Sequence, residues 1–108
     1  MNELVVRRAE PSIAVVSINR PKKRNAINFS TWKGLRDQFL ALGADAEVRV
    51  IILTGEGGYF SAGADISEFP EHRANAQLGL EYDRVAEECT QAIMHCPKPT
   101  IAAAEGFF

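Results

Sequence analysis

The 108-residue sequence contains few of the residues from which metal centres and disulfide frameworks are built. It has two cysteines, Cys89 and Cys96, and two histidines, and their spacing does not match that of a zinc site. The cysteines lie seven residues apart in a segment expected to be helical, which separates them too far along the helix axis for a disulfide. Because free cysteines suit a reducing compartment, we expect a cytoplasmic protein without a bound metal.

Long hydrophobic runs and a strong charge of one sign are also missing. No apolar stretch approaches the ~20 residues that a membrane span needs, and the N-terminus lacks the basic-then-apolar layout of a signal peptide. The net charge of −2 argues against an electrostatically driven nucleic-acid binder. We therefore expect neither membrane nor nucleic acid as a partner. One basic cluster, residues 20–24 (RPKKR), keeps small phosphorylated ligands among the alternatives.

The composition that remains is globular, with 46% hydrophobic and 24% charged residues. Residues 4–8 and 13–19 are apolar and rich in β-branched side chains, and a turn sequence at 10–12 separates them. This pattern predicts two antiparallel strands. Residues 48–54 form a nearly continuous apolar run, which is typical of a strand covered on both faces within a parallel sheet.

The spacing of apolar residues predicts two helices. The first begins at a cap on Ser30, and the second covers about residues 74–95 and ends before Pro97, since proline disfavours helical backbone at the residue before it. Their core-facing stripes are Trp32, Leu35, Phe39 and Leu42 in the first helix, and Leu78, Tyr82, Val85, Cys89, Ile93 and Cys96 in the second.

The last segment, residues 99–104, contains three alanines that admit a helix, but the flanking prolines and the preceding long helix favour a strand. The order strand, strand, helix, strand, helix, strand predicts an α/β fold with crossover connections. The sequence then ends on Phe107 and Phe108, which favours an incomplete domain.

Residues 60–66 (FSAGADI) are the most informative stretch, because they follow the predicted strand across a glycine turn at 55–58. Small residues with bare backbone, where a strand gives way to a helical turn, leave N–H groups able to bind an anion. A carbonyl oxygen that gains negative charge would suit such a turn. On its own, however, a turn of small residues more often serves packing than catalysis.

Three other chemical interpretations of this part of the chain and of its histidines are weaker. Gly55 begins a Gly-x-Gly pattern, but Phe60 stands where a dinucleotide-binding loop needs its third glycine. Ser61 lacks the preceding glycine of a nucleophile elbow, because Tyr59 occupies that position, and we interpret it as a turn residue. The histidines, His72 and His95, are interpreted as structural.

Three stretches in order resemble the crotonase superfamily, the enoyl-CoA hydratases and isomerases. Residues 18–28 (INRPKKRNAIN) are similar to its Asn-Arg-Pro motif followed by a basic residue and Asn-Ala-hydrophobic-Asn. Residues 60–66 are similar to its Phe-Ser/Ala-Ala-Gly-Ala-Asp-hydrophobic motif, and residues 98–107 to its Lys-Pro-hydrophobic-Ile-Ala-Ala strand with a Gly-aromatic end. The resemblance implies that residues 1–108 are the N-terminal part of a crotonase-like domain, an α/β spiral of ββα units that is incomplete in this chain.

The resemblance also implies roles for individual residues. The backbone N–H of Ala64 would be one donor of an oxyanion hole that holds a coenzyme A thioester carbonyl. Lys22 and Arg24 would lie near the coenzyme A phosphates and Ala26 near its adenine or pantetheine arm, although a solvated loop is the other interpretation of this basic cluster. The remaining positions along the coenzyme A path are Ala62, Gly63, Asp65 and Ile66.

A general base is not evident in this sequence. In the family, the second N–H donor and the glutamates come from a glycine-rich turn after the third motif, and Glu105 lies before that turn at a structural position. Glu68 and Glu71 could face a substrate pocket, but they are better interpreted as solvent-exposed carboxylates. We therefore expect the general acid/base beyond Phe108 and no activity from the 108 residues alone.

The implied parent protein is an enoyl-CoA hydratase or isomerase that stabilises the enolate of an acyl-CoA. Coenzyme A would be part of the substrate, with no metal or redox cofactor, and the assembly would be a homotrimer or a dimer of trimers. The alternatives are another reaction of the superfamily (thioester hydrolysis, decarboxylation, dehalogenation or ring cleavage) and a noncatalytic fragment or interaction module.

Overall fold

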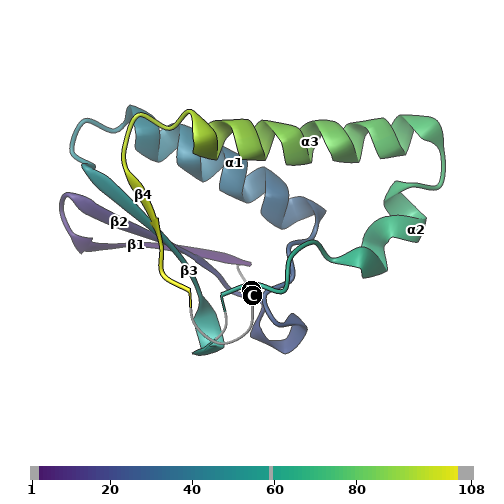
Figure 1. Cartoon of the computed structure of the whole chain (residues 1–108), viewed down its shortest axis with the longest axis horizontal. Coiled ribbons are helices and arrows are strands. Elements are labelled where there is room, and N and C mark those ends of the chain that lie inside the picture. Colours follow the sequence, from purple (N-terminus) through teal and green to yellow (C-terminus); the bar gives the residue numbers. More distant parts are fainter. Residues whose placement is uncertain (1–2, 59, 105–108) are drawn as a thin grey trace.

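The computed structural model describes residues 3–58 and 60–104 as one sheet with two long helices on the same side of it (Figure 1). The sheet has the order β1-β2-β3-β4, in which β1 and β2 are antiparallel and the other two pairs are parallel. This arrangement confirms the predicted α/β fold class. The strands are β1 (Leu4–Glu10), β2 (Ile13–Ile18), β3 (Val50–Gly55) and β4 (Thr100–Ala102).

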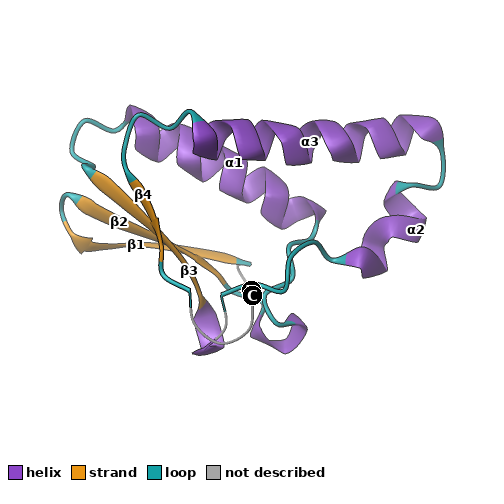
Figure 2. Ribbon diagram, viewed as in Figure 1, coloured by secondary structure: helices purple, strands orange, loops and turns teal. Residues whose placement is uncertain are grey.

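The helical elements include two long helices and several short ones that carry the loops between the strands. The long helices are α1 (Phe29–Ala44) and α3 (Ala76–Met94), and the short elements are η1 (Pro21–Lys23), η2 (Glu56–Gly58), η3 (Ile66–Glu68) and α2 (Phe69–His72). Figure 2 shows the sheet and the long helices as two layers. The helical turn expected after residues 60–66 is confirmed by η3 and α2.

The core lies between the sheet and the long helices, as the two predicted stripes require. Ala14 and Val16 of β2 pack with Phe39 of α1 and Cys89 of α3, and all four are almost fully buried. Trp32 is only partly buried, but its Nε1 donates a hydrogen bond to the Tyr82 hydroxyl at 3.1 Å and thereby connects the two helices. Apolar periodicity predicted this packing because burial repeats with the helical period.

Both long helices begin at asparagines that the sequence analysis did not select. Asn28 caps α1 by accepting a hydrogen bond from the Thr31 N–H at 2.9 Å, so the predicted cap at Ser30 is wrong and Ser30 lies inside the helix. Asn75 caps α3 by accepting from the Leu78 N–H at 2.9 Å. Asparagine caps as well as serine does, and the extended backbone of Asn28 places its side-chain oxygen over the first turn.

The prediction that residues 48–54 are covered on both faces is wrong for the described part of the chain. Of the residues in β3 only Ile51 is buried, because α1 and α3 cover one face of the sheet. β4 is a strand, as predicted, rather than a helix, but it is exposed throughout and Ile101 is 54% exposed. Two expectations concern residues that lie outside the described part of the chain. They are the incomplete domain, inferred from Phe107 and Phe108, and the structural position of Glu105.

Cys89 and Cys96 are both free thiols, which confirms that they do not pair with each other. Cys89 is buried in the core, and burial raises the pKa of its thiol to about 11. Cys96 lies just after α3 and packs against the core. Among the described helices, none is long and apolar enough to cross a membrane.

Candidate functional site

Residues 60–66 run alongside residues 24–27, so the fold brings two of the sequence motifs together. The Ile27 N–H donates to the Gly63 carbonyl at 2.7 Å, and the Ile27 carbonyl accepts from the Asp65 N–H at 2.9 Å. The Ala62 N–H donates to the Arg24 carbonyl at 2.9 Å. Ile27 and Ala64 consequently form an isolated parallel bridge between the two loops.

Ala64 is left with an unused backbone N–H. Ile27 bonds to the residues on either side of Ala64, and in a parallel pairing this directs the N–H of the middle residue away from the partner. Within residues 3–58 and 60–104, this N–H forms no hydrogen bond, and Ala64 is exposed. Gly63 precedes it with φ +94°, a conformation that a side chain would strain.

Ser61 holds the shape of this turn. Its buried hydroxyl donates to the Asn25 carbonyl at 2.8 Å and accepts from the Gly63 N–H at 3.0 Å. Among the described residues, the contacts of this hydroxyl are to main-chain groups and none is to a base. The interpretation of Ser61 as a turn residue rather than a nucleophile is confirmed.

Asn25 connects the first motif to the glycine turn, and the sequence analysis did not identify it. It is fully buried with φ 56°, and its side chain accepts from the Arg20 N–H and donates to the Glu56 carbonyl, both at 2.8 Å. Asparagine tolerates this left-handed backbone and bonds to nearby main chain, which is the signal that could have identified it. Gly57 lets the glycine turn pack closely against the first motif, because a Cβ there would lie 2.8 Å from the Pro21 Cβ.

Asp65 was predicted to lie along the coenzyme A path, but its carboxylate is engaged within the protein. One oxygen accepts from the main-chain N–H and the hydroxyl of Ser67, at 3.0 and 2.6 Å, and the other pairs with Arg20 at 3.0 Å. The Ser67 hydroxyl, assisted by Arg20 and opposed by burial, lowers the pKa of Asp65. Asp65 therefore caps η3 and fixes the loop, while the neighbouring Ile66 is exposed.

The basic cluster is a set of exposed cations beside this loop. Lys22, Lys23 and Arg24 lie on or just after η1, and none of them forms an ion pair with another described residue. Arg24 has φ 52°, a conformation that non-glycine residues seldom adopt. Ala26 is half-buried, and its carbonyl accepts a hydrogen bond from Arg20. These cations are positioned as an anion site or a solvated loop would require, so both interpretations stay open.

The two candidate carboxylates after the loop differ. Glu68 is not solvent-exposed as predicted: its side chain is 24% exposed and accepts from the Phe29 N–H at 2.7 Å, at the start of α1. Glu71 is exposed, as predicted. His72 stacks on Phe29 with the ring centroids 4.8 Å apart, as a structural histidine would. The main-chain N–H of His95 closes the end of α3, and a structural role for its exposed side chain stays a prediction.

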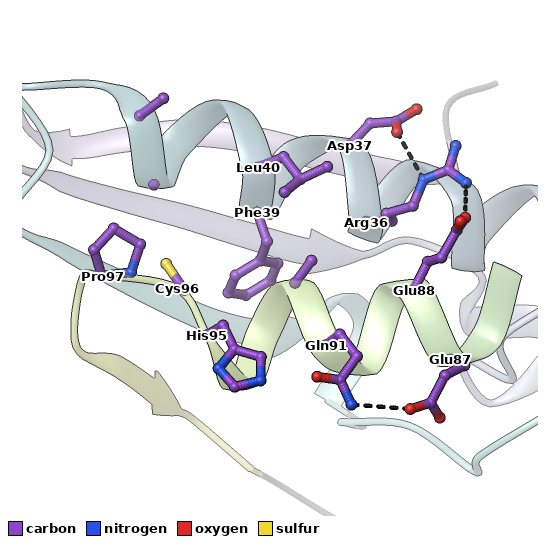
Figure 3. A pocket seen from close by; sticks show the side chains of 13 residues that line it. Arg36, Asp37, Phe39, Leu40, Glu87, Glu88, Gln91, His95, Cys96 and Pro97 are labelled. Atoms are coloured by element: carbon purple, nitrogen blue, oxygen red, sulfur yellow. Dashed lines mark hydrogen bonds and ion pairs between the residues drawn. The ribbon is translucent and has the colours of Figure 1, made fainter. Parts of the chain in front are cut away.

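A separate groove lies between the C-terminal halves of α1 and α3 (Figure 3). Phe39, Leu40 and Pro97 line it, and the ion pair of Arg36 with Glu88, at 2.7 Å, borders it. None of the predicted site residues lines this groove. The Ala64 loop instead meets the N-terminal end of α1, through Glu68.

The arrangement around Ala64 has the chemistry of one side of an oxyanion site. It offers one outward N–H on a backbone that internal hydrogen bonds hold in place, with small exposed side chains that leave the approach open. Such a preorganised donor favours an oxygen atom whose negative charge grows during a reaction. Exposed cations lie nearby in the bridged loop and favour an anionic ligand.

Comparison with known proteins gives a consistent result. A family model described as enoyl-CoA hydratase/isomerase matches residues 8–108. The chain is 39% identical over 104 residues to the short-chain-enoyl-CoA hydratase of Clostridium acetobutylicum, and 31% identical over 113 residues to the human mitochondrial Delta(3,5)-Delta(2,4)-dienoyl-CoA isomerase. These alignments cover 95% of this chain in both cases, but 39% and 34% of the relatives.

A solved structure of an enoyl-CoA hydratase/carnithine racemase from Magnetospirillum magneticum is similar over the same region. It superposes with a TM-score of 0.90 at 41% identity and covers 98% of this chain and 40% of that one. The chain thus spans about two fifths of the length of proteins it resembles in both sequence and fold. The expected crotonase-like α/β architecture is confirmed.

Proposed function

Since the chain belongs to the enoyl-CoA hydratase/isomerase family, we propose that the complete protein binds an acyl-CoA thioester and stabilises its enolate in an oxyanion hole. The backbone N–H of Ala64 is one donor of that hole. The observation that carries this proposal is the outward N–H of Ala64, which has no acceptor among the described residues although the groups around it are bonded.

The proposed chemistry uses this donor where charge develops. Addition of water to the β-carbon of a 2-enoyl-CoA, or removal of an α- or γ-proton, moves negative charge onto the thioester oxygen. A fixed N–H binds that enolate oxygen more strongly than the neutral carbonyl, so it lowers the barrier instead of only tightening substrate binding. Loss of one such donor costs about 3 to 4 kcal/mol in comparable sites.

The other groups of the reaction are proposed to come from outside this sequence. The second N–H donor and the general acid/base are expected there, because the described carboxylates near the loop, Asp65 and Glu68, are engaged by Arg20 and the start of α1. Whether the enolate is formed by addition of water to the β-carbon or by removal of a proton decides between a lyase (hydratase) and an isomerase. The relatives include one of each.

We further propose that the two bridged loops hold coenzyme A. Lys22 and Arg24 contact its phosphates, which their exposure and lack of ion pairs within the described residues support. The small residues Ala26, Ala62 and Gly63 leave room for the adenine and pantetheine, with Ile66 exposed at the end of the path. Asp65 contributes by holding the loop, since its carboxylate is already engaged.

The remaining proposals concern the whole protein. It acts in the cytoplasm as a homotrimer or a dimer of trimers, needs neither a metal nor a redox cofactor, and has neither membrane nor nucleic acid as a partner. Sedimentation analysis of the complete protein tests the assembly directly, and a stable monomer would contradict it.

The function is tested by assaying the complete protein with a 2-enoyl-CoA for hydration and with a 3-enoyl-CoA for isomerisation. We expect turnover of one of them, and a KM raised about tenfold or more in the Lys22→Gln/Arg24→Gln variant with kcat retained. Lys33→Gln, on the exposed face of α1, is the control and should leave KM unchanged. Failure of both reactions would reject the proposal, and release of free coenzyme A would favour a hydrolase instead.

A further inference from the structure

The guanidinium of Arg20 connects three segments of the chain beside the Ala64 loop. Its Nη1 donates to the Ala26 carbonyl and, at 3.0 Å, to Oδ2 of Asp65, while its Nε pairs with Oε2 of Glu3 at 2.9 Å. The Arg20 side chain is 13% exposed and that of Asp65 is 10% exposed. The planar, permanently charged guanidinium can satisfy several acceptors in fixed directions at once.

The contacts of Arg20 fall on both sides of the bridge between the loops. Ala26 directly precedes Ile27, and Asp65 directly follows Ala64, which are the two bridge residues. One guanidinium therefore holds the backbone of the first loop against a side chain of the second. The Ala64 N–H lies in the same planar peptide as the Gly63 carbonyl, which accepts from the Ile27 N–H, and that N–H lies in the same peptide as the Ala26 carbonyl. The direction of the Ala64 N–H therefore depends on how Arg20 holds Ala26.

We propose that Arg20 is a positioning residue, which fixes the direction of the Ala64 N–H by clamping Ala26 and Asp65. It does not touch the substrate. This assignment rests on the proposed function as far as catalysis is concerned, but the orientation of the N–H is a property of the protein itself. It gives a role to a residue that the resemblance placed in a motif without assigning it one.

The partners of Asp65 explain why loss of Arg20 would move the loop. Without the guanidinium, the Asp65 carboxylate keeps only the two hydrogen bonds from Ser67 and is left as a nearly buried, unbalanced charge. A carboxylate in that position gains solvation free energy by turning toward water. Such a turn would weaken the bond from the Asp65 N–H to the Ile27 carbonyl, on one side of Ala64. Loss of Arg20 would also free the Ala26–Ile27 peptide, whose N–H holds the Gly63 carbonyl, so the Gly63–Ala64 peptide could rotate.

The sheet offers a matched control at its other end. Arg8 pairs with Asp45 at 2.8 Å and with Glu47 at 3.4 Å, and its side chain is 34% exposed. Arg8 pairs in register with Ala14, whereas the first residue of β1, next to Glu3, pairs with Ile18 at the end near the loop. Arg8→Gln therefore removes an arginine ion pair without reaching Ala64.

The test combines kinetics with a direct measurement of the bond direction. The complete protein is prepared as wild type, Arg20→Gln, Asp65→Asn and Arg8→Gln, with ¹⁵N-labelled alanine, and the residual dipolar coupling of the Ala64 N–H is measured in a weakly aligned sample. Asp65→Asn is nearly isosteric and serves if Arg20→Gln does not fold. In parallel, kcat and KM are determined for an enoyl-CoA that the wild type turns over.

We expect the Ala64 coupling to change in Arg20→Gln and Asp65→Asn and to stay at the wild-type value in Arg8→Gln. The kcat of the first two variants should fall about tenfold or more while KM changes less than about threefold. Combining Arg20→Gln with Asp65→Asn should add little further loss, because the two residues act as a unit. A merely structural role would lower stability in all variants without separating kcat from KM.

An unchanged Ala64 coupling in folded Arg20→Gln or Asp65→Asn would overturn the assignment, whatever the activity. If the wild type turned over no acyl-CoA but the coupling still changed, the proposed function would fail and the positioning of the N–H by Arg20 would stand. If the coupling stayed constant in an active wild type and its variants, the function would stand and the positioning role would fall.

Discussion

Ser61 shapes the candidate site through hydrogen bonds to the main chain and not through a reactive side chain. Its hydroxyl has two main-chain partners, the Asn25 carbonyl and the Gly63 N–H, and Ser61→Ala removes both of these hydrogen bonds. We expect that variant to lose about 1 to 3 kcal/mol in the free energy of unfolding, measured by urea denaturation. Its kcat should fall less than about tenfold, because no covalent step uses the hydroxyl. A loss of activity of about ten-thousandfold in a folded Ser61→Ala protein would instead indicate that Ser61 is a nucleophile.

Asp65 should give the protein a recognisable acid sensitivity. Its pKa lies below the ordinary value of 3.8, because the Ser67 hydroxyl donates to the carboxylate and Arg20 pairs with it. The unfolded chain therefore takes up this proton first as the pH falls, so the stabilisation is present above pH 3.8 and is lost below it.

Between about pH 7 and about pH 3, the free energy of unfolding of Asp65→Asn should consequently fall less than that of the wild type, measured by urea denaturation at each pH. The control is Asp45→Asn, whose carboxylate pKa is also lowered but whose side chain is 37% exposed. It should flatten the pH dependence less. Equal slopes for wild type and Asp65→Asn would show that the contacts of Asp65 contribute nothing to stability.

At the level of residues, the sequence allowed the Ala64 loop to be located but not what holds it. Small residues after a strand are a local signal, and Ala64 indeed has an outward N–H. Arg20 and Asn25 were missed because their partners lie far along the chain, 45 residues from Arg20 to Asp65 and 31 from Asn25 to Glu56. Such pairings depend on the tertiary fold and leave no periodic pattern.

At the level of elements, apolar spacing predicted both long helices to within a few residues, since burial on one side imposes the helical period. The start of α1 was misplaced because Asn28 and Ser30 are both good caps and both side chains donate to Glu3. The extended backbone of Asn28, which lets its side chain accept from the Thr31 N–H, distinguishes the two. The coverage of β3 was misjudged because an apolar run does not reveal which faces are packed.

The two asparagine caps give a prediction for these helices. Asn28→Ala should lower the free energy of unfolding by about 2 kcal/mol and Asn75→Ala by about 1 kcal/mol, measured by urea denaturation. The larger effect follows because Asn28 also bonds the buried Thr31 hydroxyl and Glu3, whereas the Asn75 cap is exposed. Ser30→Ala should change stability by less than about 0.5 kcal/mol. If Ser30→Ala were as harmful as Asn28→Ala, the assignment of the cap would be wrong.

At the scale of the whole molecule, the described residues hold one side of the proposed reaction site. The first two motifs are brought together by the Ile27–Ala64 bridge, while the third forms β4 beside β3 and ends at residues that are not described. The chain also spans only about two fifths of its relatives. Sequence resemblance could predict the family and fold from these motifs, but not a complete set of reacting groups.

The 108-residue polypeptide by itself should therefore not hydrate crotonyl-CoA. One N–H donor without a second donor or a positioned general base leaves out most of the expected rate enhancement. The measurement is the loss of the enoyl-thioester absorbance in the presence of the purified polypeptide, with circular dichroism to verify that it is folded. Clear turnover above the buffer rate would show that the acid/base group lies within these residues.

The most direct test of the central claim removes the Ala64 N–H by a proline substitution, with a second proline substitution as the control for the added backbone restriction. Ala64→Pro deletes this donor at a position where no described residue accepts from it, and Ala46→Pro is the control, placed second in the exposed turn that the Val48 N–H closes onto the Asp45 carbonyl. In the complete protein, we predict that kcat for the enoyl-CoA substrate falls about 10² to 10³-fold in Ala64→Pro and is unchanged in Ala46→Pro, with both variants folded. Normal turnover by a folded Ala64→Pro protein would remove Ala64 from the mechanism.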